Sequence, residues 1–134
     1  MTSFDQAVRV VVAGWAVFLL MTVLVVAERG GDHLANMAVF AAIGAAMLAW
    51  VALRHSRASL VTSLVLGVLH TVEQIAYLVA GATADHPDGV QVAVDGVGLV
   101  SGLLLVAGSG AALSRLRKSP AATSPRSTSA ADTL

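Results

Sequence analysis

Residues 8–27 read VRVVVAGWAVFLLMTVLVVA, and after Arg9 this stretch contains no charged residue. Crossing the hydrocarbon core of a bilayer, which is roughly 30 Å thick, takes about 20 mainly apolar residues in an α-helix. Three further stretches meet the same requirement, at residues 34–53, 58–81 and 89–113. The sequence therefore predicts an all-α integral membrane protein with four transmembrane helices.

The composition of the whole chain agrees with a lipid environment. Of its 134 residues, 57% are hydrophobic and only 12% are charged, whereas soluble domains average about 45–50% apolar and about 25% charged residues. A soluble protein of this size would need more surface charge to stay dissolved. The absence of cysteine excludes disulfides and thiolate chemistry. Basic residues cluster only beside the predicted helices, which argues against nucleic acid as a partner.

Short connections, at residues 28–33, 54–57 and 82–88, join the predicted helices. Such connections make consecutive helices antiparallel, so we expect residues 1–113 to form one domain, an up-down-up-down four-helix bundle. The remaining residues, 114–134, are basic at first and then rich in Ser, Ala, Thr and Pro. This composition cannot bury enough apolar surface to order itself, and it predicts a disordered tail.

The basic residues predict the orientation of the chain, because Lys and Arg near helix ends stay in the cytoplasm. Of the eight Lys and Arg residues, only Arg29 falls on the side of the first and third connections. Both termini are therefore expected to be cytoplasmic. The frequent use of Ala, Val and Gly suggests a bacterial protein, so we expect it in the inner membrane. Trp15 and Trp50 then lie near cytoplasmic helix ends, where interfacial tryptophans are common. The alternative is that the first helix is a cleaved signal peptide, because residues 25–27, before Glu28, resemble the small residues that precede a signal-peptidase site. Cleavage there would leave three transmembrane helices.

Small residues form rows on two of the predicted helices. The second helix has one row of Ala38, Ala42 and Ala46 and a neighbouring row of Ala41, Ala45 and Ala49, and the fourth helix has Gly98, Gly102, Gly108 and Ala112. Small residues let membrane helices approach closely, so we expect these rows to be packing surfaces. The alternative is an interface with a second copy or with another membrane protein.

Polar residues interrupt the apolar helices mainly in the outer half of the membrane. They lie on the second, third and fourth predicted helices and are Asn36, His70, Glu73, Gln74, Tyr77 and Asp95. At ~1.5 Å per residue, His70 lies near the midplane and Glu73 about 5 Å outward, while Asp95, Tyr77 and Asn36 lie about 10 Å outward. The helical period places the four residues of the third helix on one face. The sequence therefore predicts a polar pocket that opens to the outer face.

This pocket suggests the chemistry that the protein performs. A charged carboxylate near the bilayer centre costs at least ~2.5–3.5 kcal/mol without a partner, so Glu73 must be neutral, paired with His70, or compensated by a cation or water. We interpret His70, Glu73 and Asp95 as catalytic or proton-carrying residues. Gln74, Tyr77 and Asn36 are the candidates for holding a substrate. Groups that differ in proton affinity suit acid–base chemistry. We therefore expect a protein that binds or processes a small lipophilic molecule, or that conducts protons.

Two other functions remain open at this stage. The polar stripe could be a packing contact in an accessory or assembly subunit of a larger membrane complex. It could also belong to a metal or haem site, because His70 and Glu73 are three residues apart on one helix face, which resembles the carboxylate–histidine spacing of di-iron bundles in reverse order. The other helices offer no matching ligand at that depth. No metal ligand is therefore assigned, and the sequence leaves the cofactor undetermined.

Overall fold

The computed structural model describes residues 3–119 and contains four long α-helices. They are α1 (Phe4–Arg29), α2 (Leu34–Leu53), α3 (Arg57–Ala82) and α4 (Gly89–Lys118), and a short 3-10 helix, η1 (Gly31–His33), precedes α2. All four are long and apolar enough to cross a membrane, and residues 3–119 contain no strand. The predicted all-α class and the four apolar helices are confirmed, and they indicate a multi-pass membrane protein.

Local sequence explains where the helices begin and end. At the start of α1 the hydroxyl of Ser3 accepts a hydrogen bond from the backbone N–H of Gln6 (3.1 Å), and the Gln6 side chain accepts one from the Ser3 N–H (2.9 Å). This reciprocal pair is a capping box. Asp88 starts α4 by accepting a hydrogen bond from the N–H of Val90. Gly30 ends α1 with a positive φ of 73°, a backbone conformation that favours glycine.

The fourth helix is longer than the sequence predicts. It continues through Ser114 to Lys118, so the boundary of the expected tail moves from residue 114 to the end of α4. Arg115, Arg117 and Lys118 lie in the last turn, where positive charge interacts favourably with the negative end of the helix dipole. The rest of the predicted disordered tail, residues 120–134, lies outside the described residues.

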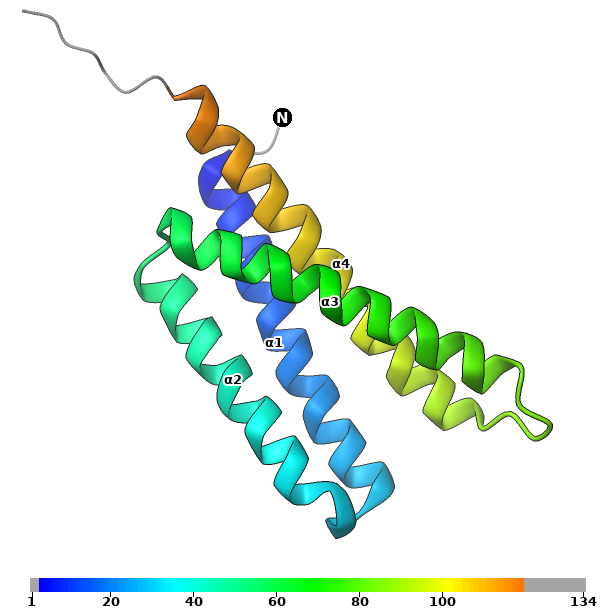
Figure 1. Cartoon of the computed structure of the whole chain (residues 1–134). Helices are drawn as coiled ribbons and strands as arrows, with labels where there is room; N and C mark the ends of the chain where they lie inside the picture. The colour runs from blue at the N-terminus through cyan, green and yellow to red at the C-terminus, as the bar shows by residue number, and fades with distance from the viewer. Residues whose placement is uncertain (1–2, 120–134) are drawn as a thin grey trace, which may run out of the picture.

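The helices form two hairpins, α1–α2 and α3–α4, that diverge from each other (Figure 1). Helix α4 packs extensively against both α1 and α3, and α2 packs against α1. Contacts between α2 and α3 are few, and these helices separate from the turn that joins them (Figure 1). The closed half, as we call it, contains the start of α1, the α2–α3 turn and the end of α4. The half with the tips of the two hairpins is the open half.

The closed half is held together by glycines that bring helix backbones into contact. Leu105 of α4 is fully buried and fits between two of them. A Cβ atom on Gly14 of α1 would lie 3.1 Å from the backbone nitrogen of Leu105, and one on Gly67 of α3 would lie 2.7 Å from its Cβ. Further along α4, a Cβ on Gly108 would lie 2.9 Å from the backbone nitrogen of Val11. The glycine row predicted on α4 is therefore a packing surface.

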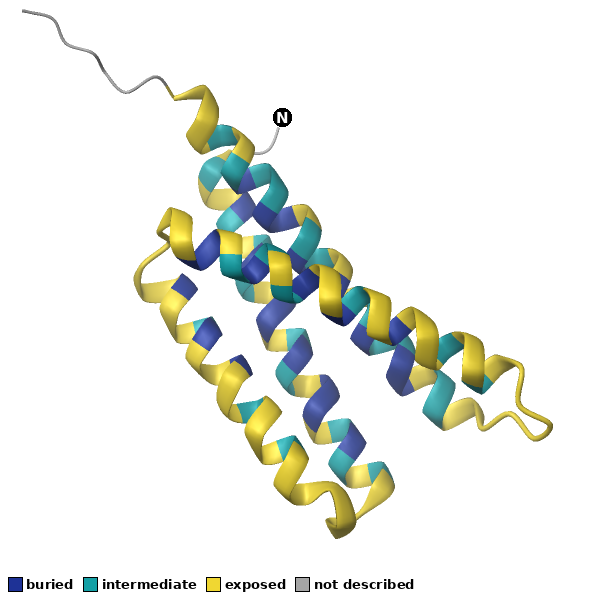
Figure 2. Ribbon diagram, viewed as in Figure 1, coloured by how far each residue is buried: buried dark blue, intermediate teal, exposed yellow. Residues whose placement is uncertain are grey.

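The alanine rows of α2 do not pack as expected. Five of the six alanines are exposed and Ala41 is only half-buried, and Figure 2 shows that most of α2 is exposed. The buried residues of α2 are Gly44, Met47 and Val51, which lie on the opposite helix face. A Cβ on Gly44 would lie 2.8 Å from the Phe18 ring. Helix α2 therefore approaches α1 through this glycine, and its alanines face away.

Candidate functional site

A cavity of about 610 Å³ lies in the open half and is bordered by all four helices. Its volume is within the usual range of small-molecule sites, roughly 300–1,000 Å³. Helices α1 and α2 supply most of its apolar wall, and α3 and α4 supply most of its polar groups. The lining residues are Phe18, Met21, Thr22, Val25, Arg29, His33, Asn36, Met37, Val39, Phe40, His70, Glu73, Gln74, Tyr77 and Asp95.

All six residues singled out in the sequence line this one cavity. Their burial differs, however. His70, Gln74 and Asp95 are buried, with exposed fractions of 8%, 5% and 5%. Asn36, Glu73 and Tyr77 are exposed. The structure therefore brings the predicted residues together as a buried group of three and a more accessible group of three.

His70 lies at the contact between α3 and α1. Its ring meets the Phe18 ring edge to face, with 5.0 Å between centroids. Its Nδ1 atom is 3.8 Å from the Glu73 carboxylate, one helical turn along α3. This is the only pair of oppositely chargeable groups within 4.0 Å in residues 3–119. The Glu73 side chain is 48% exposed, so it connects the buried imidazole to the accessible part of the cavity.

Three buried atoms of this site have unused hydrogen-bonding capacity. His70 Nε2, Gln74 Oε1 and Asp95 Oδ2 make no hydrogen bond within the described part of the chain. More than 90% of buried polar groups in proteins are hydrogen-bonded, and an unpaired one costs about 1–3 kcal/mol. Here three such atoms belong to residues that line the same cavity. The cavity is therefore bordered by three residues with spare hydrogen-bonding capacity.

Packing against α4 fixes the position of Gln74. A Cβ atom placed on Gly98 would collide with the side-chain amide of Gln74, so this amide lies directly against the α4 backbone. One turn toward the closed half, Gly102 faces Thr71 in the same way, with 3.1 Å between a Cβ on Gly102 and the Thr71 Cα. The GxxxG spacing that identifies a packing surface thus also positions Gln74, which lines the cavity.

Sequence reasoning missed several lining residues, of which Arg29 is the most informative. Arg29 ends α1 and shares the cavity with Asp95. As the only Lys or Arg on its side of the predicted membrane, it was a visible exception to the charge pattern and could have been identified. His33 also lines the cavity. The apolar wall of Phe18, Met21 and Val25 resembles any other helix face in the sequence and gave no signal.

A smaller cavity of about 180 Å³ extends from the same site between α2 and α3. It shares Phe18, Phe40, His70 and Glu73 with the larger cavity, and Ile43, Leu66, Leu69 and other apolar residues complete its wall. Its lining residues Ile43 and Leu69 are also exposed, so the smaller cavity lies at a surface that would face lipid. The polar site is thus continuous with an apolar passage.

The geometry offers little to a metal ion. Within residues 3–119, no group of three or more His, Asp or Glu side chains lies close enough to hold one. His70 and Glu73 are a single pair, and the other acidic lining residue, Asp95, does not complete a ligand set with them. No family model, curated protein or solved structure matches this chain. The geometry of the cavity is therefore the basis for a functional proposal.

Proposed function

We propose that this protein binds a small amphiphilic molecule in the cavity between its two hairpins. The observation that carries the proposal is that three residues with unpartnered buried atoms, His70, Gln74 and Asp95, line one otherwise largely apolar cavity. Ligand sites typically combine an apolar wall with a few polar groups that orient the ligand. Small side-chain rotations turn these polar groups toward the polar group of the ligand, and its apolar part lies against Phe18, Phe40 and the gap between α2 and α3.

The orientation of the chain is part of this proposal. Both termini are cytoplasmic in the inner membrane, because seven of the eight basic residues lie on the side of the termini and the α2–α3 turn. The cavity then opens toward the outer face. Asn36, Tyr77 and Arg29 are at its mouth, while His70 is deepest. The ligand enters from the outer leaflet or from the water above it.

His70 and Glu73 are proposed to exchange a proton with the bound molecule. Their separation of 3.8 Å is slightly longer than the roughly 2.6–3.2 Å over which a proton is transferred directly, so a small movement of the half-exposed Glu73 side chain would bring the two groups into reach. Conduction across the whole membrane is less well supported. Between His70 and the closed half, the hydroxyls of Ser63 and Ser101 are already engaged, with the Trp15 N–H and the Gly14 carbonyl respectively. Binding, with local proton exchange, is therefore preferred over a continuous proton path.

The direct test is to identify what co-purifies with the protein. Chain purified in mild detergent is extracted with organic solvent, and the extract is compared by mass spectrometry with extracts of His70→Ala and Asp95→Asn variants. We expect a small molecule at up to one per chain that both variants lose by at least about tenfold, the effect of removing one hydrogen bond to a charged group. Asp85→Asn is the matched control, because Asp85 is exposed and does not line the cavity.

The control variant is expected to retain the molecule. Equal small-molecule content in the wild type, His70→Ala and Asp95→Asn, with all three chains folded, would contradict a binding function. Loss of folded protein in both cavity variants would instead favour the packing role of an accessory subunit.

The orientation has its own test, which the cysteine-free sequence makes simple. Single cysteines are introduced at Asp85, in the tip of the α3–α4 hairpin, and at Ser56, in the α2–α3 turn. A membrane-impermeant maleimide added to intact cells should label Asp85→Cys, and it should label Ser56→Cys only after the membrane is opened. The reverse pattern would place the cavity mouth in the cytoplasm.

A further inference from the structure

A second cavity, of about 670 Å³, lies at the opposite end of the molecule, between the start of α3 and the end of α4. It is separate from the polar site and shares no lining residue with it. Its wall combines basic, hydroxyl and apolar side chains, and the lining residues are His55, Ser56, Arg57, Val61, Leu64, Gly110, Leu113, Ser114, Leu116 and Arg117.

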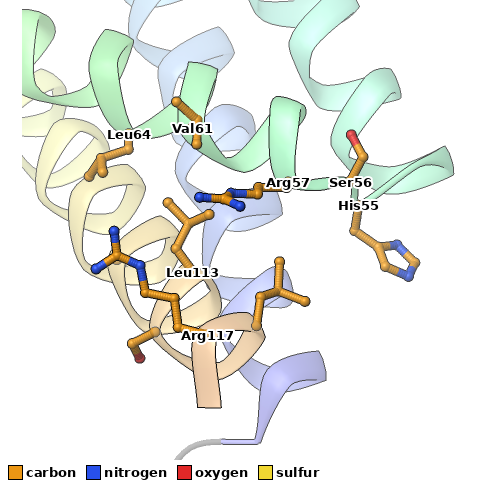
Figure 3. A pocket seen from close by; sticks show the side chains of 10 residues that line it. His55, Ser56, Arg57, Val61, Leu64, Leu113 and Arg117 are labelled. Carbon is orange, nitrogen blue, oxygen red and sulfur yellow. The ribbon is translucent and has the colours of Figure 1, made fainter. Parts of the chain in front are cut away.

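The mouth of this cavity is positively charged. Figure 3 shows Arg57 and Arg117 reaching from α3 and α4 toward the space between these helices, with Leu113 nearby. No acidic residue lines the cavity, and within residues 3–119 neither guanidinium has a carboxylate within 4.0 Å. The nearby basic residues Arg54 and Lys118 add to the charge, and the described acidic residue at this end is Asp5 in the first turn of α1.

His55 contributes less to the mouth than its position in the chain suggests. Its ring packs against Phe4 of α1, with 6.0 Å between centroids, and Figure 3 shows it turned away from both guanidinium groups. The two arginines are therefore the groups that an anion would meet. Guanidinium groups bind phosphate in a bidentate manner, and their charge does not depend on pH in the physiological range.

Below the mouth the cavity becomes apolar. Val61 and Leu64 of α3 lie one and two turns from Arg57, and Leu113 of α4 lies one turn from Arg117. Gly110 is at the floor, where a Cβ atom would meet no other atom within 4 Å. Since seven residues of helix span about 10 Å, the apolar part runs from Arg57 to Leu64 into the membrane-spanning part of α3. The cavity thus has a cationic mouth and an apolar groove.

We propose that this cavity binds one anionic phospholipid from the leaflet on the side of the chain termini. Its phosphate lies between Arg57 and Arg117, and one acyl chain follows Val61 and Leu64 along the groove over Gly110. Basic clusters beside membrane helices attract anionic lipids in general. The groove adds a place for the acyl chain, which a diffuse attraction would not require. This site is independent of the function proposed for the other cavity.

The first test separates the two cavity arginines from general charge. The full-length protein in detergent is titrated with phosphatidylglycerol and, separately, with phosphatidylcholine of the same acyl chains, and bound lipid is counted by native mass spectrometry. The double variant Arg57→Gln/Arg117→Gln should bind phosphatidylglycerol roughly thirtyfold more weakly and lose the preference over phosphatidylcholine. The matched control, Arg54→Gln/Lys118→Gln, removes the same charge at the same end without changing the cavity lining, and it should retain the preference.

The second test blocks the groove without changing charge. Gly110→Leu fills the open space at the floor, and Gly96→Leu is its control, because Gly96 is also on α4 and a Cβ there meets nothing within 4 Å. Gly110→Leu should bind at least severalfold less phosphatidylglycerol than the wild type, whereas Gly96→Leu should bind the same amount. Equal weakening by the two charge variants would overturn the proposal in favour of diffuse attraction. Unchanged binding in Gly110→Leu would also overturn it, because the acyl chain would then lie elsewhere.

Discussion

The closed and open halves of the molecule are made from the same four helices, but different interactions hold them. In the closed half, Gly14 and Gly108 bring α1 and α4 into backbone contact. Two interhelical hydrogen bonds supplement this packing, from Trp15 Nε1 to Ser63 Oγ and from Ser101 Oγ to the Gly14 carbonyl, both 3.0 Å long. In the described part of the open half, no side-chain hydrogen bond joins two helices.

This difference follows from the solvent. Lipid tails are as apolar as leucine, so membrane helices gain little by burying apolar side chains against each other. Close packing at small residues and polar contacts must supply the attraction instead. Where close packing and polar contacts are both present, the helices lie against each other. Contacts of these two kinds are lacking between α2 and α3, so these helices separate, and the polar groups of the cavity remain without partners. Close packing at Gly98 persists within the α3–α4 hairpin, so the binding capacity of the open half lies between the two hairpins.

The largest effect is expected from a methyl group in the closed half. Gly108→Ala places a Cβ 2.9 Å from the backbone nitrogen of Val11, and neither backbone can yield without separating α1 from α4. Overpacking of this kind costs about 1–3 kcal/mol, so the free energy of unfolding should fall by that amount. The measurement is unfolding in mixed detergent, followed by tryptophan fluorescence in a Trp50→Phe background, so that the signal comes from Trp15, which is buried in this half.

Gly110→Ala is the matched control for this substitution. It lies two residues further along α4, where a Cβ meets no atom within 4 Å. It should be neutral, or slightly stabilising because alanine favours helix over glycine. If Gly108→Ala and Gly110→Ala were tolerated equally, backbone contact between α1 and α4 would not be the basis of the closed half.

A smaller effect is expected from the interhelical hydrogen bonds. Ser63→Ala removes the acceptor of the Trp15 N–H and leaves a buried donor unpaired. Interhelical hydrogen bonds in membranes contribute on average about 0.6 kcal/mol and at most about 1.7, so a loss within this range is expected. Combining Ser63→Ala with Trp15→Phe gives a double-mutant cycle. A coupling energy near zero would mean that the bond does not stabilise the closed half.

The sequence predicted much of this comparison because two of its signals are strong. Four long apolar stretches identify the helices, and polar residues within such helices rarely face lipid. His70, Gln74 and Asp95 could therefore be assigned to one pocket before their burial was known. The same reasoning correctly identified Gly98 and Gly102 as packing positions, because their spacing matches a known contact geometry.

Other features depend on contacts between helices and could not be predicted. The alanines of α2 have the right spacing for packing, but Gly44 on the opposite face allows closer approach to Phe18. Trp15 was interpreted as an interfacial anchor, yet it is only 2% exposed and bonds to Ser63. The separation of α2 from α3 has no signal in either helix alone. It results from the way each packs on α1 and α4.

The smallest effect on stability is expected in the open half, where it distinguishes a binding site from a packing contact. Gln74 is buried against Gly98, but its Oε1 atom makes no hydrogen bond within the described residues. Gln74→Leu keeps a similar volume and removes an unpaired polar group, so the free energy of unfolding should change by less than about 0.5 kcal/mol, or rise. If the polar residues instead hold the hairpins together, the same substitution should destabilise the protein as much as Ser63→Ala does.

Retention of the co-purifying small molecule, measured on the same samples, should fall in Gln74→Leu even though stability does not. A variant that is as stable as the wild type but empties the cavity would assign Gln74 to the ligand, because no loss of folding could then explain the loss of binding.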